Sequence, residues 1–266
     1  MATRELIPRL EIIVAARRHY VSARKAQTPI EAVRALASMQ KRPQPVLSGI
    51  RGDTAAITLI GQIRGEVDSH PGDVTEPGAL AKRLEDAGVD AIALFTDNYM
   101  DTNGLDMLVD VVRQVNVPVI SEDVVIDEYQ VVEARAAGAS ALLLRSSILE
   151  PQLLRSLVSA TQRNRMTAVV EASTLAEVEY ALSLSPYVIA LSSRNPLTGQ
   201  PNNTPIQQLR TVIPSSQRIM LAESLDTLEE AEMAAALNVD AVLVNCDLIT
   251  DPISAAALNK ILRRSS

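Results

Sequence analysis

In this sequence of 266 residues, polar and mostly charged side chains follow short apolar runs. They are Arg64, Asp97, Glu122, Asp123, Arg145, Glu171, Arg194, Glu223, Ser224, Cys246 and Asp247. Carboxylates can act as general acids or bases, and arginines bind carboxylate and phosphate groups in a bidentate manner. If the ends of the runs meet in space, these residues predict a site that binds a small anion and transfers protons. The alternative is that the charges neutralise one another as ion pairs.

The elements that must position these side chains form a repeated unit. In three copies, an amphipathic helical stretch ends at Gly88, Gly138 or Asn238 and is followed at once by a short apolar run. Glycine and asparagine readily adopt the left-handed backbone conformation at which many helices end. Runs that are apolar at every position are typical of strands buried on both faces. Each copy therefore predicts a helix followed by a buried parallel strand.

About eight such runs follow residue 50, at spacings of roughly 20 to 35 residues. They cover 56–63, 89–94, 117–120, 139–144, 167–170, 187–191, 218–222 and 239–244. One helix is expected after each run, and no hairpin signal joins neighbouring runs. The pattern predicts an α/β protein with a closed (β/α)8 barrel, the TIM-barrel fold. An open doubly wound sheet would need a G-x-G-x-x-G loop after its first strand, and Gly61-Gln62-Ile63-Arg64-Gly65 does not fit.

The start of the chain lies outside this repeat. We expect residues 1–50 to form an N-terminal helical extension with its linker, and residues 51–266 to form the barrel as one structural domain. Leu10, Ile13 and Val14 have the spacing of one helix face.

The composition excludes several kinds of partner. A net charge of -7 repels a nucleic-acid backbone, and 2% aromatic residues leave little for bases to stack on. No apolar stretch approaches the roughly 18 residues of a membrane helix, and we expect no leader peptide. The single cysteine, Cys246, permits no internal disulfide. We therefore expect a cytoplasmic protein that binds neither nucleic acid nor membranes.

Four phrases of the sequence carry a resemblance to a known family. They are LEIIVAARR at 10–18, YQVVEARAAGA at 129–139, VEA at 170–172 and AES at 222–224. In this order, over nearly the whole chain, they resemble the indole-3-glycerol phosphate synthase family. That family is a barrel lyase of tryptophan biosynthesis, which closes the indole ring on a phosphorylated anilino sugar with loss of carbon dioxide. The resemblance implies the same fold, and we expect no cofactor.

The resemblance also assigns catalytic positions, several of which carry other residues here. The family's first strand ends in a glutamate and, two positions later, a lysine; Gln62 and Arg64 stand there. Its general-acid lysine on the third strand is replaced by Glu122, although Asp123 of the same motif remains. Arginine is a poor proton donor because its pKa lies above about 12. Losing the acid should cost about 10²- to 10⁴-fold in rate, unless a buried glutamic acid with a raised pKa replaces it.

The phosphate loops of the family are altered as well. The family has glycine after its seventh and eighth strands, where backbone N–H groups approach the phosphate. Here Leu225 follows Ser224, and Asn245 occupies the other position. Asp247 adds a like charge, and such a charge about 4 Å away would cost about 4 kcal/mol at an effective dielectric constant near 20.

The retained residues define the candidate site. By resemblance, Glu171, Glu223 and Asp123 are catalytic candidates, and the candidates for binding substrate or another anion are Arg64, Arg194, Ser224 and Asn245. The family's asparagine pair after the sixth strand is replaced by Ser192 and Ser193.

Two hypotheses follow. The first is a family barrel that has lost ring closure and is non-catalytic or altered in function, with a protein partner as one option. The alternative is an active enzyme, either the synthase itself or another acid/base enzyme that uses Glu171 and Glu223 with Arg64 and Arg194 as anion clamps.

A metal site is the less favoured interpretation of the strand-end carboxylates. Asp97, Asp123, Glu171 and Glu223 offer the oxygen ligands that hard divalent cations prefer. Arginines on neighbouring strands would compete for them, and no D-x-D or H-x-x-E spacing marks a ligand set, so we expect no metal. His70, in the loop after the first strand, could titrate near neutrality at the same mouth.

Overall fold

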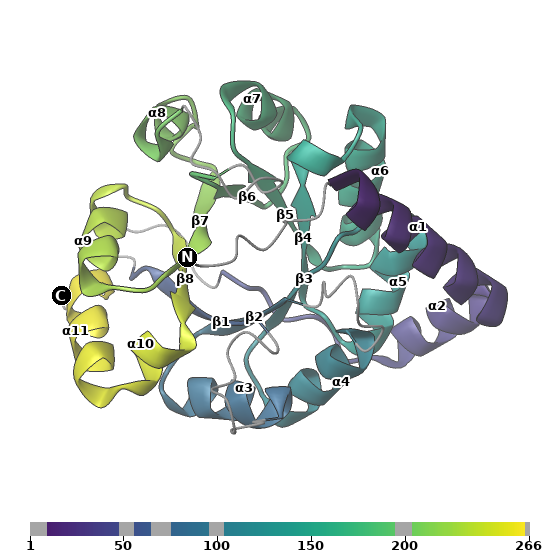
Figure 1. The fold of residues 1–266 in the computed structure, drawn as a ribbon, viewed down its shortest axis with the longest axis horizontal. Helices are drawn as coiled ribbons and strands as arrows, with labels where there is room; N and C mark the ends of the chain where they lie inside the picture. Colours follow the sequence, from purple (N-terminus) through teal and green to yellow (C-terminus); the bar gives the residue numbers. More distant parts are fainter. Residues whose placement is uncertain (1–9, 48–55, 65–75, 96–103, 195–203, 264–266) are drawn as a thin grey trace, which may run out of the picture.

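The computed structural model describes residues 10–47, 56–64, 76–95, 104–194 and 204–263. Eight parallel strands pair in sequence order and close into a barrel, with β8 bonded to β1. Helices surround the strands (Figure 1). The strands are β1 Thr58–Ile63, β2 Ala91–Phe95, β3 Val119–Glu122, β4 Ala141–Arg145, β5 Thr167–Ala172, β6 Val188–Leu191, β7 Arg218–Leu225 and β8 Ala241–Asn245. The predicted (β/α)8 barrel is confirmed.

The helices of the barrel alternate with these strands. Among the described residues they are α3 Pro77–Asp86, α4 Gly104–Gln114, α5 Glu128–Ala137, α6 Pro151–Arg163, α7 Leu175–Ser183, α8 Ile206–Thr211, α9 Leu228–Ala236, α10 Cys246–Thr250 and α11 Pro252–Leu262, with a 3-10 turn at Ser146–Ile148. Two helices, α10 and α11, follow β8 where the sequence predicts one. Asn245 caps the short α10, which ends where Asp251 caps α11.

The strands are buried on both faces because they separate two apolar clusters. The inner cluster fills the barrel with small and branched side chains, including Ile60, Leu143, Val169 and Leu243. The larger outer cluster lies between the strands and the helices around them. Such double burial explains why the strands appear in the sequence as continuous apolar runs.

Left-handed residues end three of the helices as predicted. Gly88 and Gly138 have φ of 94° and 99°, and Asn238 has φ of 51°. Ser185 and Arg165 also adopt positive φ, at 51° and 61°, which their residue types do not predict. Residues other than glycine and asparagine are uncommon in this left-handed conformation, because a Cβ crowds the backbone.

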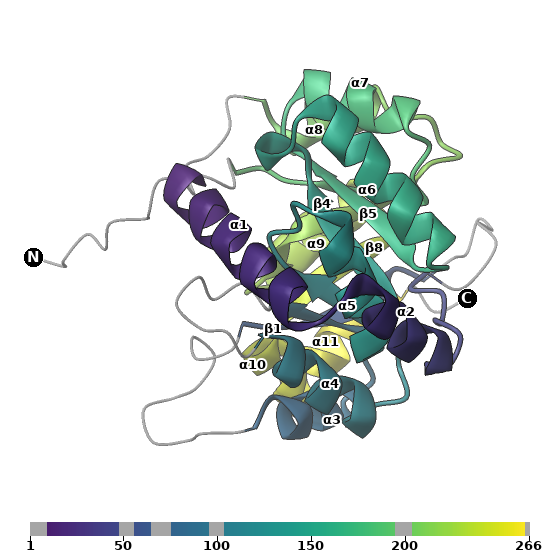
Figure 2. The same cartoon turned by 90° about the vertical axis from the view of Figure 1, so that its right-hand side faces the viewer.

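Two N-terminal helices, α1 Leu10–Gln27 and α2 Ile30–Met39, precede the barrel. Seen from the side, α1 runs along the outside of the molecule close to α5 (Figure 2). Arg24 Nε donates to Glu133 Oε1 of α5 at 2.8 Å, and Tyr129 Oη donates to the Thr28 carbonyl at 2.8 Å. The predicted division after residue 50 falls outside the described residues, so that boundary stays a prediction.

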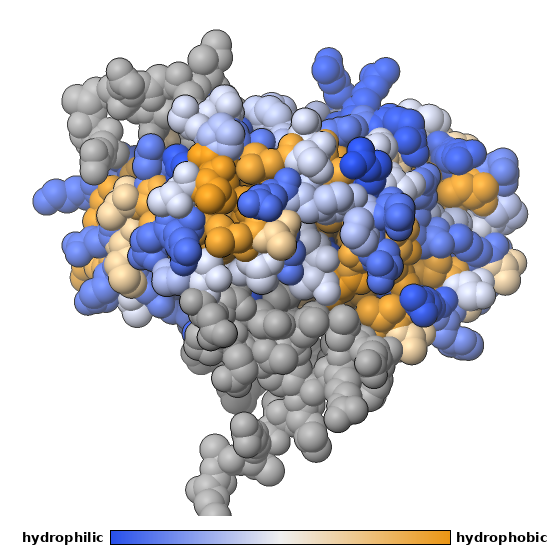
Figure 3. All heavy atoms as spheres, turned by 90° about the horizontal axis from the view of Figure 1, so that it is seen from above, coloured by the Kyte–Doolittle hydropathy of each residue, from blue (hydrophilic) through white to orange (hydrophobic). Residues whose placement is uncertain are grey.

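The described surface is largely hydrophilic when viewed from the side that carries α7 and α8, with apolar residues in separate patches (Figure 3). Large exposed apolar side chains are dispersed over several elements: Leu36, Met39, Tyr187, Val212, Met233 and Ile253. Within the described ranges, no helix combines the length and the apolar character that crossing a membrane requires.

Candidate active site

The strand pleat carries polar side chains to one end of the barrel. Successive residues of a strand point to opposite faces, so the residue two positions beyond an inward apolar side chain also points inward. The pairs of inward apolar residue and following polar residue are Ile60 and Gln62, Ile120 and Glu122, Leu143 and Arg145, Val169 and Glu171, Ala190 and Ser192, and Leu243 and Asn245. Polar groups thus converge at the carboxyl ends of the strands, where enzymes of this fold have their active sites.

A buried amide links the ends of β1 and β3. Gln62 Nε2 donates to Glu122 Oε2 at 2.8 Å, and Arg64 Nε donates to Gln62 Oε1 at 2.8 Å. Glu122 is 2% exposed. Burial raises the pKa of its carboxyl group, and Arg145, Gln62 and Arg64 oppose that rise. Glu122 is therefore a buried acid whose protonated form is favoured relative to a glutamate in water.

An ion pair joins the next two strand ends. Arg145 Nε lies 3.1 Å from Glu171 Oε2, as their register in the sheet requires. Arg145 Nη1 also donates to the Asp123 carbonyl at 3.2 Å. Burial raises the pKa of Glu171, Arg145 opposes that rise, and the negative charges of Glu122 and Glu223 add to it. The charge of Arg145 thus acts on two buried carboxyl groups, those of Glu122 and Glu171.

Asp123 forms its ion pair with the N-terminal extension. Its Oδ1 lies 3.0 Å from Arg17 Nη2 of α1 and accepts a hydrogen bond from the Val124 amide at 2.6 Å. The Arg17 guanidinium lies 5.3 Å from the centre of the Tyr20 ring. Asp123 therefore connects α1 to the mouth of the barrel.

One oxygen of Glu223 accepts four hydrogen bonds from the segment after β6. Its Oε1 accepts from Ser192 Oγ at 2.9 Å, Ser193 N at 2.5 Å, Ser193 Oγ at 3.1 Å and Arg194 N at 3.1 Å. The two serines, which stand where the resembled family has asparagines, hold this carboxylate in place. Glu223 Oε1 has little remaining capacity to accept a substrate proton.

Ser224 and Asn245 lie at the ends of β7 and β8, next to the loops in which the family resemblance places the phosphate. Asn245 Oδ1 accepts from the Asp247 amide at 3.0 Å, and its Nδ2 donates to Asp226 Oδ1 at 2.9 Å. The register between β7 and β8 shifts at Leu221 and Ser224. Ser224 Oγ is buried without a hydrogen-bond partner among the described residues. The polar groups of Asn245 are therefore used within the chain.

Comparison with known proteins decides the family. The profile described as indole-3-glycerol phosphate synthase matches residues 10–261. The chain belongs to the indole-3-glycerol phosphate synthase family. It is 34% identical over 246 residues to the indole-3-glycerol phosphate synthase of Mycobacteroides abscessus, covering 89% of this chain and 88% of that protein. It is 33% identical over 260 residues to that of Kineococcus radiotolerans, with 93% of each chain covered.

Solved structures extend the likeness at the level of the fold. The 3-hexulose-6-phosphate synthase of Salmonella typhimurium aligns with a TM-score of 0.61 at 17% identity, over 77% of this chain and 98% of that one. The N-acetylmannosamine-6-phosphate 2-epimerase of Clostridium perfringens aligns with a TM-score of 0.55 at 16% identity, over 74% of this chain and 92% of that one. At this identity the alignments show a shared barrel alone.

The predicted site residues of this family member divide into separate clusters. Glu171 lies with Arg145 and close enough to Glu122 and Glu223 for their charges to act on its pKa. Asp123 turns to α1, and Asn245 turns to Asp226. Asp97 and His70 lie outside the described residues. Across the described ranges, no three histidine, cysteine or acidic side chains gather in a way that could hold a metal ion.

Two contributors to the mouth were not among the candidate site residues chosen from the sequence. Arg145 appears among the strand-end charges, and its position two residues after the inward Leu143 could have marked it. Arg17 shares helical spacing with Val14 and the buried Val21, which places a charged residue on the apolar face of α1. A charged residue on an apolar face is a usable signal for a buried partner.

Proposed function

We propose that this member of the indole-3-glycerol phosphate synthase family has lost the ring-closing decarboxylation and is a non-catalytic or altered-function protein. The hydrogen bond between Gln62 and Glu122 carries the proposal. By resemblance, these two positions hold a glutamate and the general-acid lysine in active members. Here an amide and a carboxylate occupy them and bind each other in a buried place.

The exchange removes a positively charged proton donor. A lysine ammonium both donates a proton and stabilises negative charge that develops nearby, whereas an ionised glutamate does neither. Arg64 keeps a positive charge two residues after Gln62, but a guanidinium rarely releases its proton. We therefore assign Arg64, with Arg194, to holding a small anion at the mouth. Among the basic groups that the structure describes at the mouth, none is an evident proton donor to a substrate.

Weak phosphate binding follows from the loops after β7 and β8. Asn245 Oδ1 already accepts from the amide of Asp247, the second residue of α10, and the Asp247 carboxylate lies at that helix start. A phosphate dianion would have to displace Asn245 and approach the Asp247 carboxylate.

The absence of a disulfide-forming pair of cysteines supports a cytoplasmic location, which we also propose.

Partial reversion tests the proposal. One variant would carry Gln62→Glu, Arg64→Lys and Glu122→Lys, and a matched control would carry the first two changes with Glu122→Gln. At high concentration of the anilino-deoxyribulose phosphate, we expect the first variant to form the indole product at least about tenfold faster than the control. If the unmodified chain matches the Mycobacteroides abscessus relative run beside it, the proposal fails.

A second candidate is an acid/base enzyme with a rewired site. It is supported by the raised pKa values of Glu122 and Glu171, since pairs of carboxyl groups with shifted pKa values are typical of acid/base sites. In this role one glutamic acid donates a proton, the other accepts one, and Arg64 and Arg194 bind an anionic substrate. Carbon-13 NMR of the carboxyl groups, assigned with Glu122→Gln and Glu171→Gln, tests the role. Ordinary glutamate pKa values for both groups would remove this candidate.

A further inference from the structure

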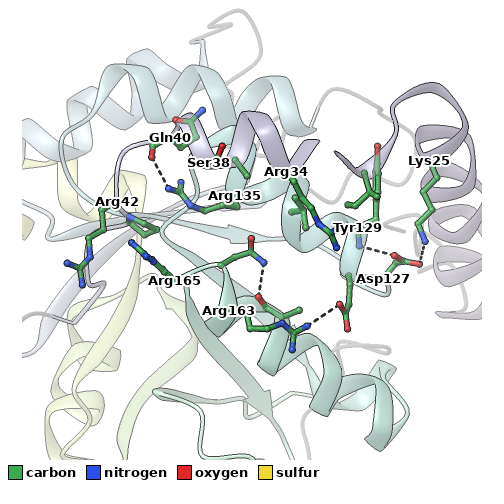
Figure 4. Close-up of a pocket in the computed structure, with 17 residues that line it drawn as sticks. Lys25, Arg34, Ser38, Gln40, Arg42, Asp127, Tyr129, Arg135, Arg163 and Arg165 are labelled. Carbon is green, nitrogen blue, oxygen red and sulfur yellow. Dashed lines mark hydrogen bonds and ion pairs between the residues drawn. The ribbon is translucent and has the colours of Figure 1, made fainter. Parts of the chain in front are cut away.

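A cavity of about 950 Å³ lies on the outside of the barrel between α2, α5 and α6 (Figure 4). None of its lining residues belongs to the strand-end site. Apolar side chains contribute part of its wall, including Ile30, Ala37, Val132 and Ala160. Its volume falls in the range of pockets that take small organic ligands, about 300 to 1,000 Å³. The cavity therefore has room for a molecule with an apolar body.

The charge of the cavity opposes that of the chain. Its lining includes the basic residues Lys25, Arg34, Arg42, Arg135, Arg163 and Arg165, and the acidic residues Asp127 and Glu128. The whole chain carries a net charge of -7. A local excess of positive charge on a negatively charged protein raises the local concentration of anions.

Both carboxylates of the cavity are already engaged. Lys25 Nζ lies 2.6 Å from Asp127 Oδ2, and Arg163 Nη2 lies 3.2 Å from Glu128 Oε2. Within the described ranges, no carboxylate forms an ion pair with the other four cations: Arg34, Arg42, Arg135 and Arg165. The excess of positive charge thus remains uncompensated by the chain that the structure describes.

Arg135 is the most informative of these four. Only 7% of it is exposed, and its Nη2 donates to the carbonyls of Gln40 at 3.1 Å and Lys41 at 2.6 Å. Burial lowers the pKa of its guanidinium, and the like charge of Arg165 lowers it further. A buried cation with a second cation beside it is costly unless an anion neutralises them. Figure 4 shows Arg42, Arg135 and Arg165 towards one end of the cavity, with Arg34 further along.

Arg165 also occupies an unfavourable backbone conformation. Its φ of 61° falls in the left-handed region, one residue after Asn164, which caps the end of α6, and glycine is the usual residue at such a position. An arginine there costs about 1 kcal/mol relative to glycine. Strained residues that persist cluster at functional sites, so this position is consistent with a role for the guanidinium.

We propose that this cavity binds a small organic polyanion, a molecule with phosphate or carboxylate groups on a partly apolar body. Arg42, Arg135 and Arg165 bind the anionic groups, because guanidinium matches phosphate and carboxylate geometry. The apolar wall from α2, α5 and α6 covers the body of the ligand. Arg34 supplies a further positive charge along the cavity.

Binding of inorganic pyrophosphate at constant ionic strength tests the site. Calorimetric titration should give a saturable signal, and pyrophosphate should raise the unfolding temperature further as its free concentration rises above the dissociation constant. The double variant Arg42→Gln with Arg165→Gly should bind at least about tenfold more weakly, as expected when two contacts of a charged ligand are lost. Arg165→Gly alone should not lower the unfolding temperature, because glycine suits the left-handed conformation.

Two matched controls locate the binding. Arg155→Gln removes an exposed arginine from α6 outside the cavity, and Arg194→Gln removes one from the barrel mouth; both should retain binding. The proposal is overturned if Arg155→Gln weakens binding as much as the double variant, or if Arg194→Gln alone abolishes it. Binding of a polyglutamate peptide with no binding of pyrophosphate would also overturn it, since the occupant would then be an acidic protein segment. These outcomes are independent of turnover at the mouth.

Discussion

Glu122 and Glu171 are the residues on which the chemistry of the mouth depends. Both are buried, both have pKa values raised by burial, and they share the field of Arg145. A group that is protonated more readily in the folded protein makes the fold less stable once the pH exceeds its unfolded pKa, near 4.3 for glutamate. The two buried carboxyl groups can therefore exchange protons, and keeping them buried lowers the stability of the fold.

Replacing Glu122 by glutamine should reveal that cost. The native state binds more protons than the unfolded chain between the unfolded and folded pKa values of Glu122, so stability falls as the pH rises through that interval. The substitution Glu122→Gln keeps an acceptor for Gln62 and removes the titration. We expect the variant to gain stability relative to the unmodified protein as the pH rises above about 4.3, as measured by urea unfolding at a series of pH values. A stability difference between Glu122→Gln and the unmodified protein that does not change with pH would contradict the raised pKa of Glu122.

The pair of Arg145 and Glu171 gives a second prediction. Replacing Arg145 by methionine leaves Glu171 buried without its cation, which should cost about 3 kcal/mol. Adding Glu171→Gln should recover part of that loss, because the buried charge is then removed as well. Urea midpoints of the two single variants and the double variant measure the coupling. If the stability losses of the two single variants add up to the loss of the double variant, the ion pair contributes nothing to stability.

At the scale of elements, the alternation of helices and buried strands was predictable, and so were the left-handed helix ends at Gly88, Gly138 and Asn238. These features depend on local composition and spacing. The bonds of the mouth were not predictable in the same way, because Gln62 and Glu122 are 60 residues apart and their side chains meet only once β1 and β3 take their places on either side of β2. Predicting that Arg17 reaches the mouth would have required knowing where α1 packs on the barrel, and no local sequence pattern determines that.

The two helix-end glycines provide a matched test of packing. Each has positive φ, so alanine should cost about 1 kcal/mol at either position. At Gly138 an added Cβ would also lie 2.7 Å from Val112 Cγ1, whereas at Gly88 it would meet nothing within 4 Å. We expect Gly138→Ala to lower the free energy of unfolding by at least about 1 kcal/mol more than Gly88→Ala. Equal losses of unfolding free energy in the two variants, measured by chemical denaturation, would show that Val112 moves away from the added Cβ without cost.

At the scale of the whole molecule, the barrel and the N-terminal helices are held together by polar contacts as well as by packing. Arg17 reaches Asp123 at the mouth, and Arg24 reaches the buried Glu133 on α5. The N-terminal helices, together with α5 and α6, line the basic cavity on the outside of the barrel. That cavity was not predicted, because Lys25, Arg34 and Arg42 each have the sequence pattern of solvent-exposed charges.

Hydrogen exchange can test how α1 is attached. Arg24→Gln removes the cation from Glu133, whose side chain is 3% exposed, whereas Lys25→Gln removes a cation from the exposed pair with Asp127. Since exposed pairs contribute about 0 to 1 kcal/mol and buried ones more, Arg24→Gln should speed amide exchange in α1 several-fold and Lys25→Gln should change it little. Exchange in the barrel strands should stay the same in both. Faster exchange after Lys25→Gln alone would contradict this ranking.

The loss of ring closure is the central claim, and turnover by the unmodified chain tests it most directly. The anilino-deoxyribulose phosphate is supplied at high concentration, and indole fluorescence is followed with the Mycobacteroides abscessus relative as the reference. With Glu122 in place of the acid, we expect less than about 1% of the relative's rate, in keeping with the usual value of a general acid. A turnover of about 1 per second or more would contradict the claim.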